Sequence, residues 1–242
     1  MPFTFSHPLI ILPLYRYSKW FSMTGLIIGS MSPDFEYFMR MRMLGLYGHA
    51  AIGIFLLNPL IGLTVTFIFH LIIRNPLIRH LPAALQRRFN AYLTFNWIQY
   101  FCQHYLIVIF SLFLGSLSHI FWDSFTHPSG WFVSHSFWLN QKITLPFLQP
   151  LPVYKFIQHG SSIFGLIGIA AFIWYMPRSN LPITQINYRY WVLIVLIALL
   201  IAGIRISFNL DCLHSGHLIV SIIMSLFMST TIISLYTQDS KQ

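Results

Sequence analysis

The sequence predicts an all-α, polytopic integral membrane protein, and composition and hydropathy both point to it. Of the 242 residues, 56% are hydrophobic and only 8% are charged, whereas a soluble domain carries about 25% charged residues. Mean hydropathy is +0.68, and several apolar segments approach the roughly 20 residues that a helix needs to cross a bilayer. We expect about five transmembrane helices, preceded by one short N-terminal helix that is interfacial or re-entrant.

The N-terminal stretch is apolar but discontinuous. Residues 1–20 are interrupted by Pro8 and Pro13 and are too short to span, so we expect them to lie in the membrane interface. Residues 20–31 predict the short helix. It should stop at Ser32-Pro33-Asp34, because proline disfavours helical geometry in the residue before it and aspartate is typical of a helix start.

Longer apolar segments fill the rest of the chain, and one of them contains Pro59, which membrane helices tolerate. The predicted spans are 50–73, 98–121, 157–176, 191–210 and 218–236. We expect three regions. Residues 1–176 form a membrane domain with the His and Asp motifs, 177–189 a polar linker, and 190–242 a C-terminal pair of helices.

The net charge of +9 comes from basic residues scattered in short loops. No basic run interleaves with aromatics as a nucleic-acid groove requires, so membrane lipids are the expected partners. The segments 74–90 and 177–189 hold six Arg, against four basic residues in the loops of the other side, which predicts that these segments are cytoplasmic. We expect a bacterial cytoplasmic (inner) membrane location. Oligomeric state stays open.

The main chemical motif is His119-x-x-x-Asp123-x-x-x-His127. Residues four apart share one face of a helix, and Pro128 should end that helix near His127. His and carboxylate side chains at this spacing form part of a metal site. The alternative is a His–Asp hydrogen bond that only stabilises the helix end.

Alternation of the spans brings further polar residues to the same, non-cytoplasmic face. His49 and His159 each begin a span and are either ligands or interfacial anchors, and His7 is a further candidate ligand. Asp34 is a ligand or a helix cap. Glu36 is a catalytic base, a group that supports the ligand Asp34, or the i,i+4 partner of Arg40.

Several motifs together resemble a known family. MPFTFSHP, GSMSPDFEYF, GHAAIGIF, GSLSHIFWDSFTHPSGWF and YKFIQHGSS occur in the order seen in the bacterial membrane-protein family catalogued as domain of unknown function 4184. More distantly, the pattern is similar to membrane-bound metal-dependent hydrolases and zinc-dependent phospholipases C. That likeness implies metal ligands at Asp34, His49, His119 and Asp123, although the His-Arg-Gly-x-x-His-Ser motif of those hydrolases is absent.

These observations lead to one functional hypothesis and one alternative. We expect a divalent metal such as zinc, and hydrolysis of a lipid-like ester or phosphoester at the membrane face, with Glu36 and Asp123 catalytic. The alternative is a non-enzymatic membrane protein whose His/Asp cluster is structural or proton-linked. The predicted metal ligands are His7, Asp34, His49, His119, Asp123, His127 and His159.

Overall fold

The computed structural model describes residues 3–144, 149–208 and 214–239, and within these ranges it is predominantly helical, with two short strands. Five helices are long and apolar enough to cross a membrane, which confirms the predicted fold class. They are Gly53–His80, Trp97–Asp123, Val153–Tyr175, Tyr188–Phe208 and Ser215–Thr237.

The first span is longer than predicted because it continues through a second proline. It consists of η3 (Gly53–Leu57), α3 (Asn58–Ile68), η4 (Phe69–Ile73) and α4 (Arg74–His80), of which η3 and η4 are wide π-helical turns. Each wide turn comes directly before, or one residue before, an Asn-Pro-Leu-Ile sequence. Proline lacks the N–H that an α-helix needs and its ring crowds the preceding turn, so widening that turn lets the span continue.

The chain forms two compact units, each built from three separate stretches of sequence. The first comprises Met1–Pro33, Tyr47–Leu63 and Leu106–Tyr175, and the second Asp34–Leu46, Thr64–Tyr105 and Met176–Gln242. Neither unit is therefore simply an N-terminal or C-terminal domain.

In the first unit, η1 (Thr4–Tyr17) is a long 3₁₀ helix that packs against α9 (Val153–Tyr175). Residues 1–20 thus include a helix that packs into the unit. The approach is close because α9 presents glycines: a Cβ at Gly165 would lie 2.5 Å from the Ser6 Cβ. The same close approach places Ser6, the residue before His7, against α9.

The short predicted helix is α1 (Met23–Gly29), which crosses α6 (Trp97–Asp123) at backbone contact distance. A Cβ on Gly29 would lie 2.3 Å from the Leu112 carbonyl oxygen, and one on Gly115 would lie 2.4 Å from the Leu26 carbonyl oxygen. Gly25 and Gly29 provide the small-xxx-small spacing that lets membrane helices approach closely.

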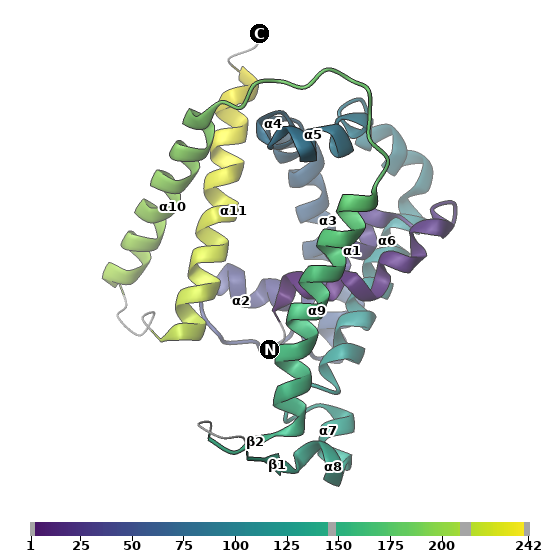
Figure 1. Cartoon of the computed structure of the whole chain (residues 1–242), viewed down its shortest axis with the longest axis vertical. Helices are drawn as coiled ribbons and strands as arrows, with labels where there is room; N and C mark the ends of the chain where they lie inside the picture. The colour runs from purple at the N-terminus through teal and green to yellow at the C-terminus, as the bar shows by residue number, and fades with distance from the viewer. Residues whose placement is uncertain (1–2, 145–148, 209–213, 240–242) are drawn as a thin grey trace. The chain divides into compact units, whose positions relative to one another are not determined.

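The connection between α6 and α9 folds into a small module that we call the foot. It contains α7 (Trp131–His135), α8 (Phe137–Asn140), β1 (Lys142–Ile143) and β2 (Leu151–Pro152). The two strands pair antiparallel, with Lys142 opposite Pro152. Figure 1 shows the foot at the N-terminal end of α9, where Val133, Leu139 and Val153 form its core.

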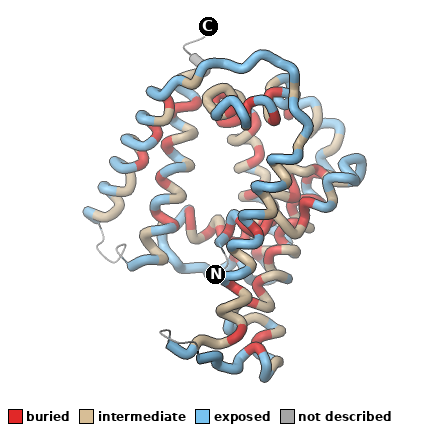
Figure 2. The backbone as a smooth tube through the Cα atoms, viewed as in Figure 1, coloured by how far each residue is buried: buried red, intermediate tan, exposed pale blue. Residues whose placement is uncertain are grey.

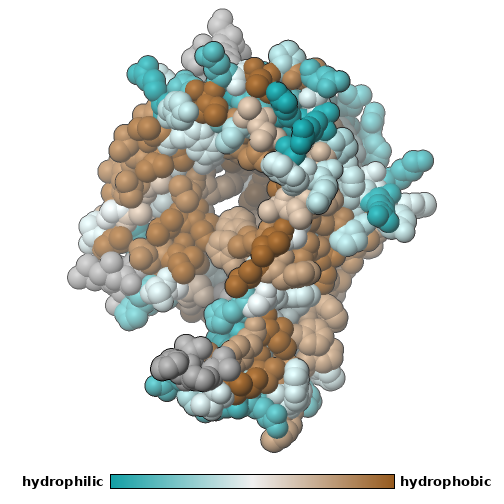
Figure 3. All heavy atoms as spheres, viewed as in Figure 1, coloured by the Kyte–Doolittle hydropathy of each residue, from teal (hydrophilic) through white to brown (hydrophobic). Residues whose placement is uncertain are grey.

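In the second unit, α10 (Tyr188–Phe208) packs against α11 (Ser215–Asp239), as Figure 1 shows. Buried residues recur every fourth position along α11, at Ser221, Ser225, Ser229 and Ile233 (Figure 2). The outward surfaces of this pair are hydrophobic (Figure 3), as a lipid-facing pair requires. The unit also contains α2 (Phe35–Arg40), α5 (Ala83–Phe89), η5 (Asn90–Tyr92) and part of η2 (Ser32–Asp34).

The linker after α9 is held along α5. The backbone N–H of Ser179 donates to the Arg87 carbonyl at 2.6 Å, and that of Thr184 donates to the buried Gln86 side chain at 2.8 Å. The segment predicted as a polar linker is therefore an ordered strap of the second unit.

Candidate metal centre

The C-terminal end of α6 carries the predicted motif. His119 and Asp123 lie one turn apart, and their side chains are 0% and 8% exposed. His119 Nε2 lies 3.3 Å from Asp123 Oδ2. The i,i+4 spacing thus places an imidazole beside a carboxylate, as the sequence predicts.

The other ring nitrogen of His119 is fixed by the backbone. Nδ1 lies 2.7 Å from the carbonyl oxygen of Ser30, which follows α1 directly. A carbonyl only accepts, so Nδ1 carries the hydrogen and Nε2 of the neutral ring presents its lone pair. The glycine contact between α1 and α6 thus sets the His119 tautomer, in the manner of an outer-shell partner of a metal-binding histidine.

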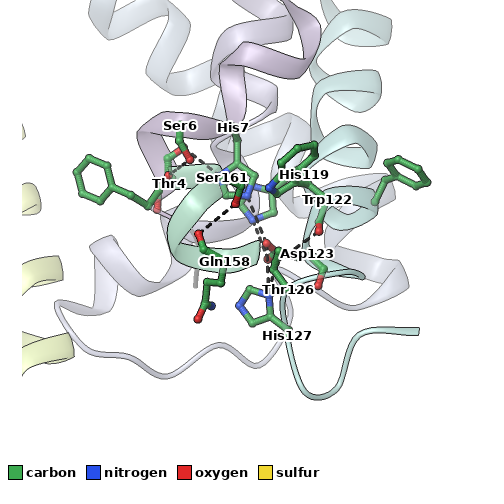
Figure 4. A network of polar contacts seen from close by, with 12 residues as sticks. Thr4, Ser6, His7, His119, Trp122, Asp123, Thr126, His127, Gln158 and Ser161 are labelled. Atoms are coloured by element: carbon green, nitrogen blue, oxygen red, sulfur yellow. Dashed lines mark hydrogen bonds and ion pairs between the residues drawn. The ribbon is translucent and has the colours of Figure 1, made fainter. Parts of the chain in front are cut away.

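His7 repeats this arrangement from η1. Its Nδ1 donates to the Thr4 carbonyl at 3.2 Å, and its Nε2 lies 3.3 Å from Asp123 Oδ1. The His7 and His119 rings stack with centroids 3.9 Å apart and planes 11° apart. Figure 4 shows both rings directed at the carboxylate. Two buried imidazoles therefore present the same nitrogen to one acid.

His49 approaches the same carboxylate from a more open side. Its Nε2 lies 3.5 Å from Asp123 Oδ2, and its side chain is 32% exposed. The preceding residue is anchored by buried Asn58, whose amide donates to the Gly48 carbonyl at 2.8 Å and to Ser116 Oγ at 2.9 Å. Asn58 thereby ties the His49 segment to α6.

His127 lies just beyond the end of α6, close to Asp123. Its Nδ1 is 3.4 Å from Asp123 Oδ1 and 3.3 Å from the Asp123 carbonyl oxygen. Burial lowers the pKa of His127, and the Asp123 charge only partly opposes this. The ring is therefore neutral at pH 7, with its hydrogen on Nδ1. Its Nε2 is buried and has no hydrogen bond within the described residues, so Nδ1 supports the carboxylate and only Nε2 is available as a ligand atom.

Asp123 is thus the centre of a four-histidine cluster. It is the only acidic residue in the sequence of the first unit, and one nitrogen of each of the four rings lies within 3.5 Å of its carboxylate. Oδ2 is buried and makes no hydrogen bond within the described part of the chain.

The distances among these ligand atoms fit a metal ion. One atom each from His7, His119 and Asp123 all lie within 4.8 Å of one another. Ligands 2.0–2.1 Å from a tetrahedral zinc stand about 3.3 Å apart, and the His7 and His119 nitrogens each lie 3.3 Å from Asp123 oxygens. Neutral imidazole and carboxylate are also the donors that zinc takes.

The remaining predicted site residues are His159, Asp34 and Glu36. His159 is exposed on α9, so the structure does not bring it to Asp123. Asp34 is fully buried and, with Glu36, belongs to the second unit. Oε1 of Glu36 accepts from Arg40 Nε at 3.0 Å and from the Leu46 N–H at 2.9 Å, as its ion-pair alternative predicts. The ligand role of Asp34 and the catalytic role of Glu36 stay predictions.

Several residues that build the site were not predicted from the sequence. Ser30 and Thr4 hold the two rings through backbone carbonyls, which every residue has, so no residue type marks these positions. Asn58 sits in a span that the sequence marks only as apolar. The spacing of Gly25, Gly29 and Gly115 is the one signal that could have indicated a close approach at Ser30.

Comparison with known proteins identifies one family, over a range of residues that includes the whole cluster. A family model described as domain of unknown function (DUF4184) matches residues 1–236. The chain belongs to the DUF4184 family. No curated protein and no solved structure matches it, so the comparisons do not support the more distant likeness to metal-dependent hydrolases and phospholipases C. For this DUF4184 protein, function has to be argued from the chemistry of the cluster.

Proposed function

We propose that His7, His119 and Asp123 bind a divalent metal ion, with His49 beside it, and that this centre hydrolyses an ester or phosphoester of a lipid-like substrate at the membrane face. The observation that carries the proposal is the direction of the two buried rings. Both commit Nδ1–H to a backbone carbonyl and turn Nε2 toward the same carboxylate.

Neutral rings in this arrangement would be unfavourable without a cation. Each Nε2 would present a lone pair to a carboxylate oxygen at 3.3 Å, and an ionised carboxylate only accepts. Two lone pairs that face each other at this distance repel rather than bond, so these contacts gain no hydrogen bond in the neutral state. A single ion between them would turn both contacts into coordination.

Protons alone satisfy the geometry less well. Protonating one ring pairs it with Asp123 and leaves the other Nε2 facing an acceptor. Protonating both places two positive rings 3.9 Å apart and fully buried, and their mutual repulsion of about 4 kcal/mol at an effective dielectric constant of 20 offsets part of the attraction of each ring to Asp123. The proton-linked alternative therefore needs two protons on stacked, buried rings, whereas a single metal ion would accept a lone pair from each ring.

The position of the cluster supports a substrate at the membrane face. Asp123 is the last residue of the apolar helix Trp97–Asp123, and His49 is the most exposed imidazole of the four by side chain. When bound, a zinc-type ion supplies a water whose pKa is near 7 for attack on the ester. The buried residues would hold that ion, while the open His49 side would admit the substrate.

Metal content of the purified protein tests the proposal. We expect about one equivalent of zinc in detergent-purified wild type after incubation with Zn²⁺ and desalting, and almost none in His119→Ala or Asp123→Ala. His135→Ala is the matched control, because His135 is exposed and, among the described residues, its hydrogen bonds stay within α7, to Ser134 and to the Trp131 carbonyl.

Two outcomes of this experiment would contradict the metal site. One is wild type that retains no metal; the other is metal content that is unchanged in the folded His119→Ala protein. Hydrolysis is measured separately, with vesicles that contain carboxylic-ester and phosphodiester lipid reporters. A metal-loaded protein that cleaves neither reporter would overturn the hydrolase part and leave a metal-binding protein.

A further inference from the structure

The foot carries large aromatic side chains that its own core does not use. Trp131 is 62% exposed, Phe137 82% and Trp138 60%. Val133 and Leu139, from the same two short helices, are buried. The foot is therefore two-sided, with an aliphatic inner face and an aromatic outer face.

These aromatics lie outside the apolar spans, where lipid tails would explain exposed hydrophobic side chains. The foot connects a span that ends at Asp123 with one that begins at Val153, so both of its ends are anchored at the same membrane surface. Tryptophan and other aromatics are characteristic of the headgroup level of a bilayer.

The charge of the foot fits lipid as the partner. Residues 124–152 contain Lys142 and no acidic residue, and Lys155 follows in the first turn of α9. Basic residues near a membrane surface are attracted to anionic headgroups. Exposed aromatics with an excess of positive charge, continuous with two spans, are the features expected of an interfacial lipid contact.

We propose that Trp131, Phe137 and Trp138 insert into the headgroup region of the leaflet at this surface, so that the foot is a lipid-binding element. This inference depends on no metal.

The foot is fixed rigidly to the end of α6. The Phe125 and Phe132 rings stack with centroids 4.0 Å apart, and the Val133 N–H donates to the Ser124 carbonyl at 3.3 Å. A Cβ at Gly130 would lie 2.5 Å from that same oxygen. Insertion of the foot would therefore fix the depth of Asp123. That consequence rests on the proposed function, because it sets the centre at headgroup level, where lipid esters and phosphoesters lie.

Site-directed spin labelling tests the insertion. A nitroxide is attached at Phe137→Cys in a Cys102→Ser/Cys212→Ser background, and the protein is reconstituted at low density in vesicles of phosphatidylcholine with phosphatidylglycerol. Leu196→Cys, on the exposed face of α10, serves as the lipid control. Gln185→Cys, in the exposed strap, serves as the water control. Trp138→Cys provides a second position in the foot.

We expect the foot labels to collide more with oxygen, which partitions into lipid, than with a water-soluble nickel chelate. Their depth should fall between those of the two controls. Chelate accessibility equal to that of the Gln185 label would overturn the inference. Dipolar broadening between labels would also overturn it, since that would show a second copy covering the foot. Because metal content is measured independently, loss of insertion and loss of the metal site can be told apart.

Discussion

Gly115→Ala tests whether the crossing of α1 and α6 positions the centre. A Cβ at residue 115 would lie 2.4 Å from the Leu26 carbonyl oxygen and 2.6 Å from the Ser30 nitrogen. Both are backbone atoms, so α1 itself must move. Restoring ordinary contact requires a shift of about 1 Å. Ser30 lies directly in the path of that shift, and its carbonyl holds His119 Nδ1 at 2.7 Å.

The magnitude follows from two opposing effects. Overpacking a close contact costs about 1–3 kcal/mol, while alanine in place of glycine within a helix contributes about 1 kcal/mol in the other direction. We expect a net loss of up to about 2 kcal/mol. Loss of the carbonyl partner of His119 should weaken zinc binding by about 10- to 100-fold, as with other partners that orient a metal ligand.

The assay compares Gly115→Ala with Gly203→Ala. A Cβ at Gly203 meets nothing within 4 Å, so that variant should be neutral or slightly stabilised and should bind zinc as the wild type does. Unfolding in mixed micelles titrated with a denaturing detergent gives the stability difference, and competition with a chromogenic chelator gives the zinc affinity. If Gly115→Ala matched Gly203→Ala in both, the crossing would not position His119.

Four further predictions concern Asn58, the pH dependence of zinc binding, His127 and Asp34. Asn58→Ala should weaken zinc binding in the wild type but have little effect in a His49→Ala background, because Asn58 acts on His49 through Gly48; equal effects in both backgrounds, measured by chelator competition, would assign Asn58 a general stabilising role. Zinc affinity should fall at least about tenfold from pH 7 to 5, since ligating imidazoles must be neutral; a flat profile would exclude histidine ligands. In metal-free protein, burial lowers the pKa of His127 below its usual 6.5, so the unfolded state binds more protons and the free energy of unfolding falls as pH drops through 6.5. In detergent unfolding, His127→Gln should show a smaller fall with pH than the wild type. An unchanged fall would contradict the lowered pKa of His127. Asp34→Asn should lower zinc content if Asp34 is a ligand, as the sequence predicts, and metal analysis beside Glu36→Gln checks this.

The fold could be predicted largely from composition, because hydropathy over about 20 residues has few structural solutions other than a spanning helix. The ends of the spans were less predictable. The first span runs on to His80, past Asn75-Pro76, because the wide turn Phe69–Ile73 accommodates the proline. Sequence alone marks a proline as a break and carries no sign of the wide turn that removes the break.

The site was predictable where it depended on local spacing and less so where it depended on helix rotation. His119 and Asp123 are four residues apart, so any α-helix brings them together. His159 lies one position after buried Gln158 on α9, and one residue turns a helix face by about 100°. The sequence could not tell which of the two faces inward. His7 comes from η1, which packs closely on α9 at Gly165, and the sequence does not show this contact between segments far apart in the chain.

The four histidines are buried to different degrees, and this difference indicates whether a metal centre here would be open or closed. Structural zinc sites surround the ion with four protein ligands, whereas catalytic sites keep one position for water or substrate. Here the His7 and His119 side chains are fully buried, and each is locked by a carbonyl bond on its far nitrogen. The His49 side chain is 32% exposed, and Asn58 holds the residue before it. Buried, fixed imidazoles on one side and an accessible imidazole on the other favour the proposed metal centre over a purely structural cluster, because a structural cluster would not require a side that is open to exchange at the membrane face.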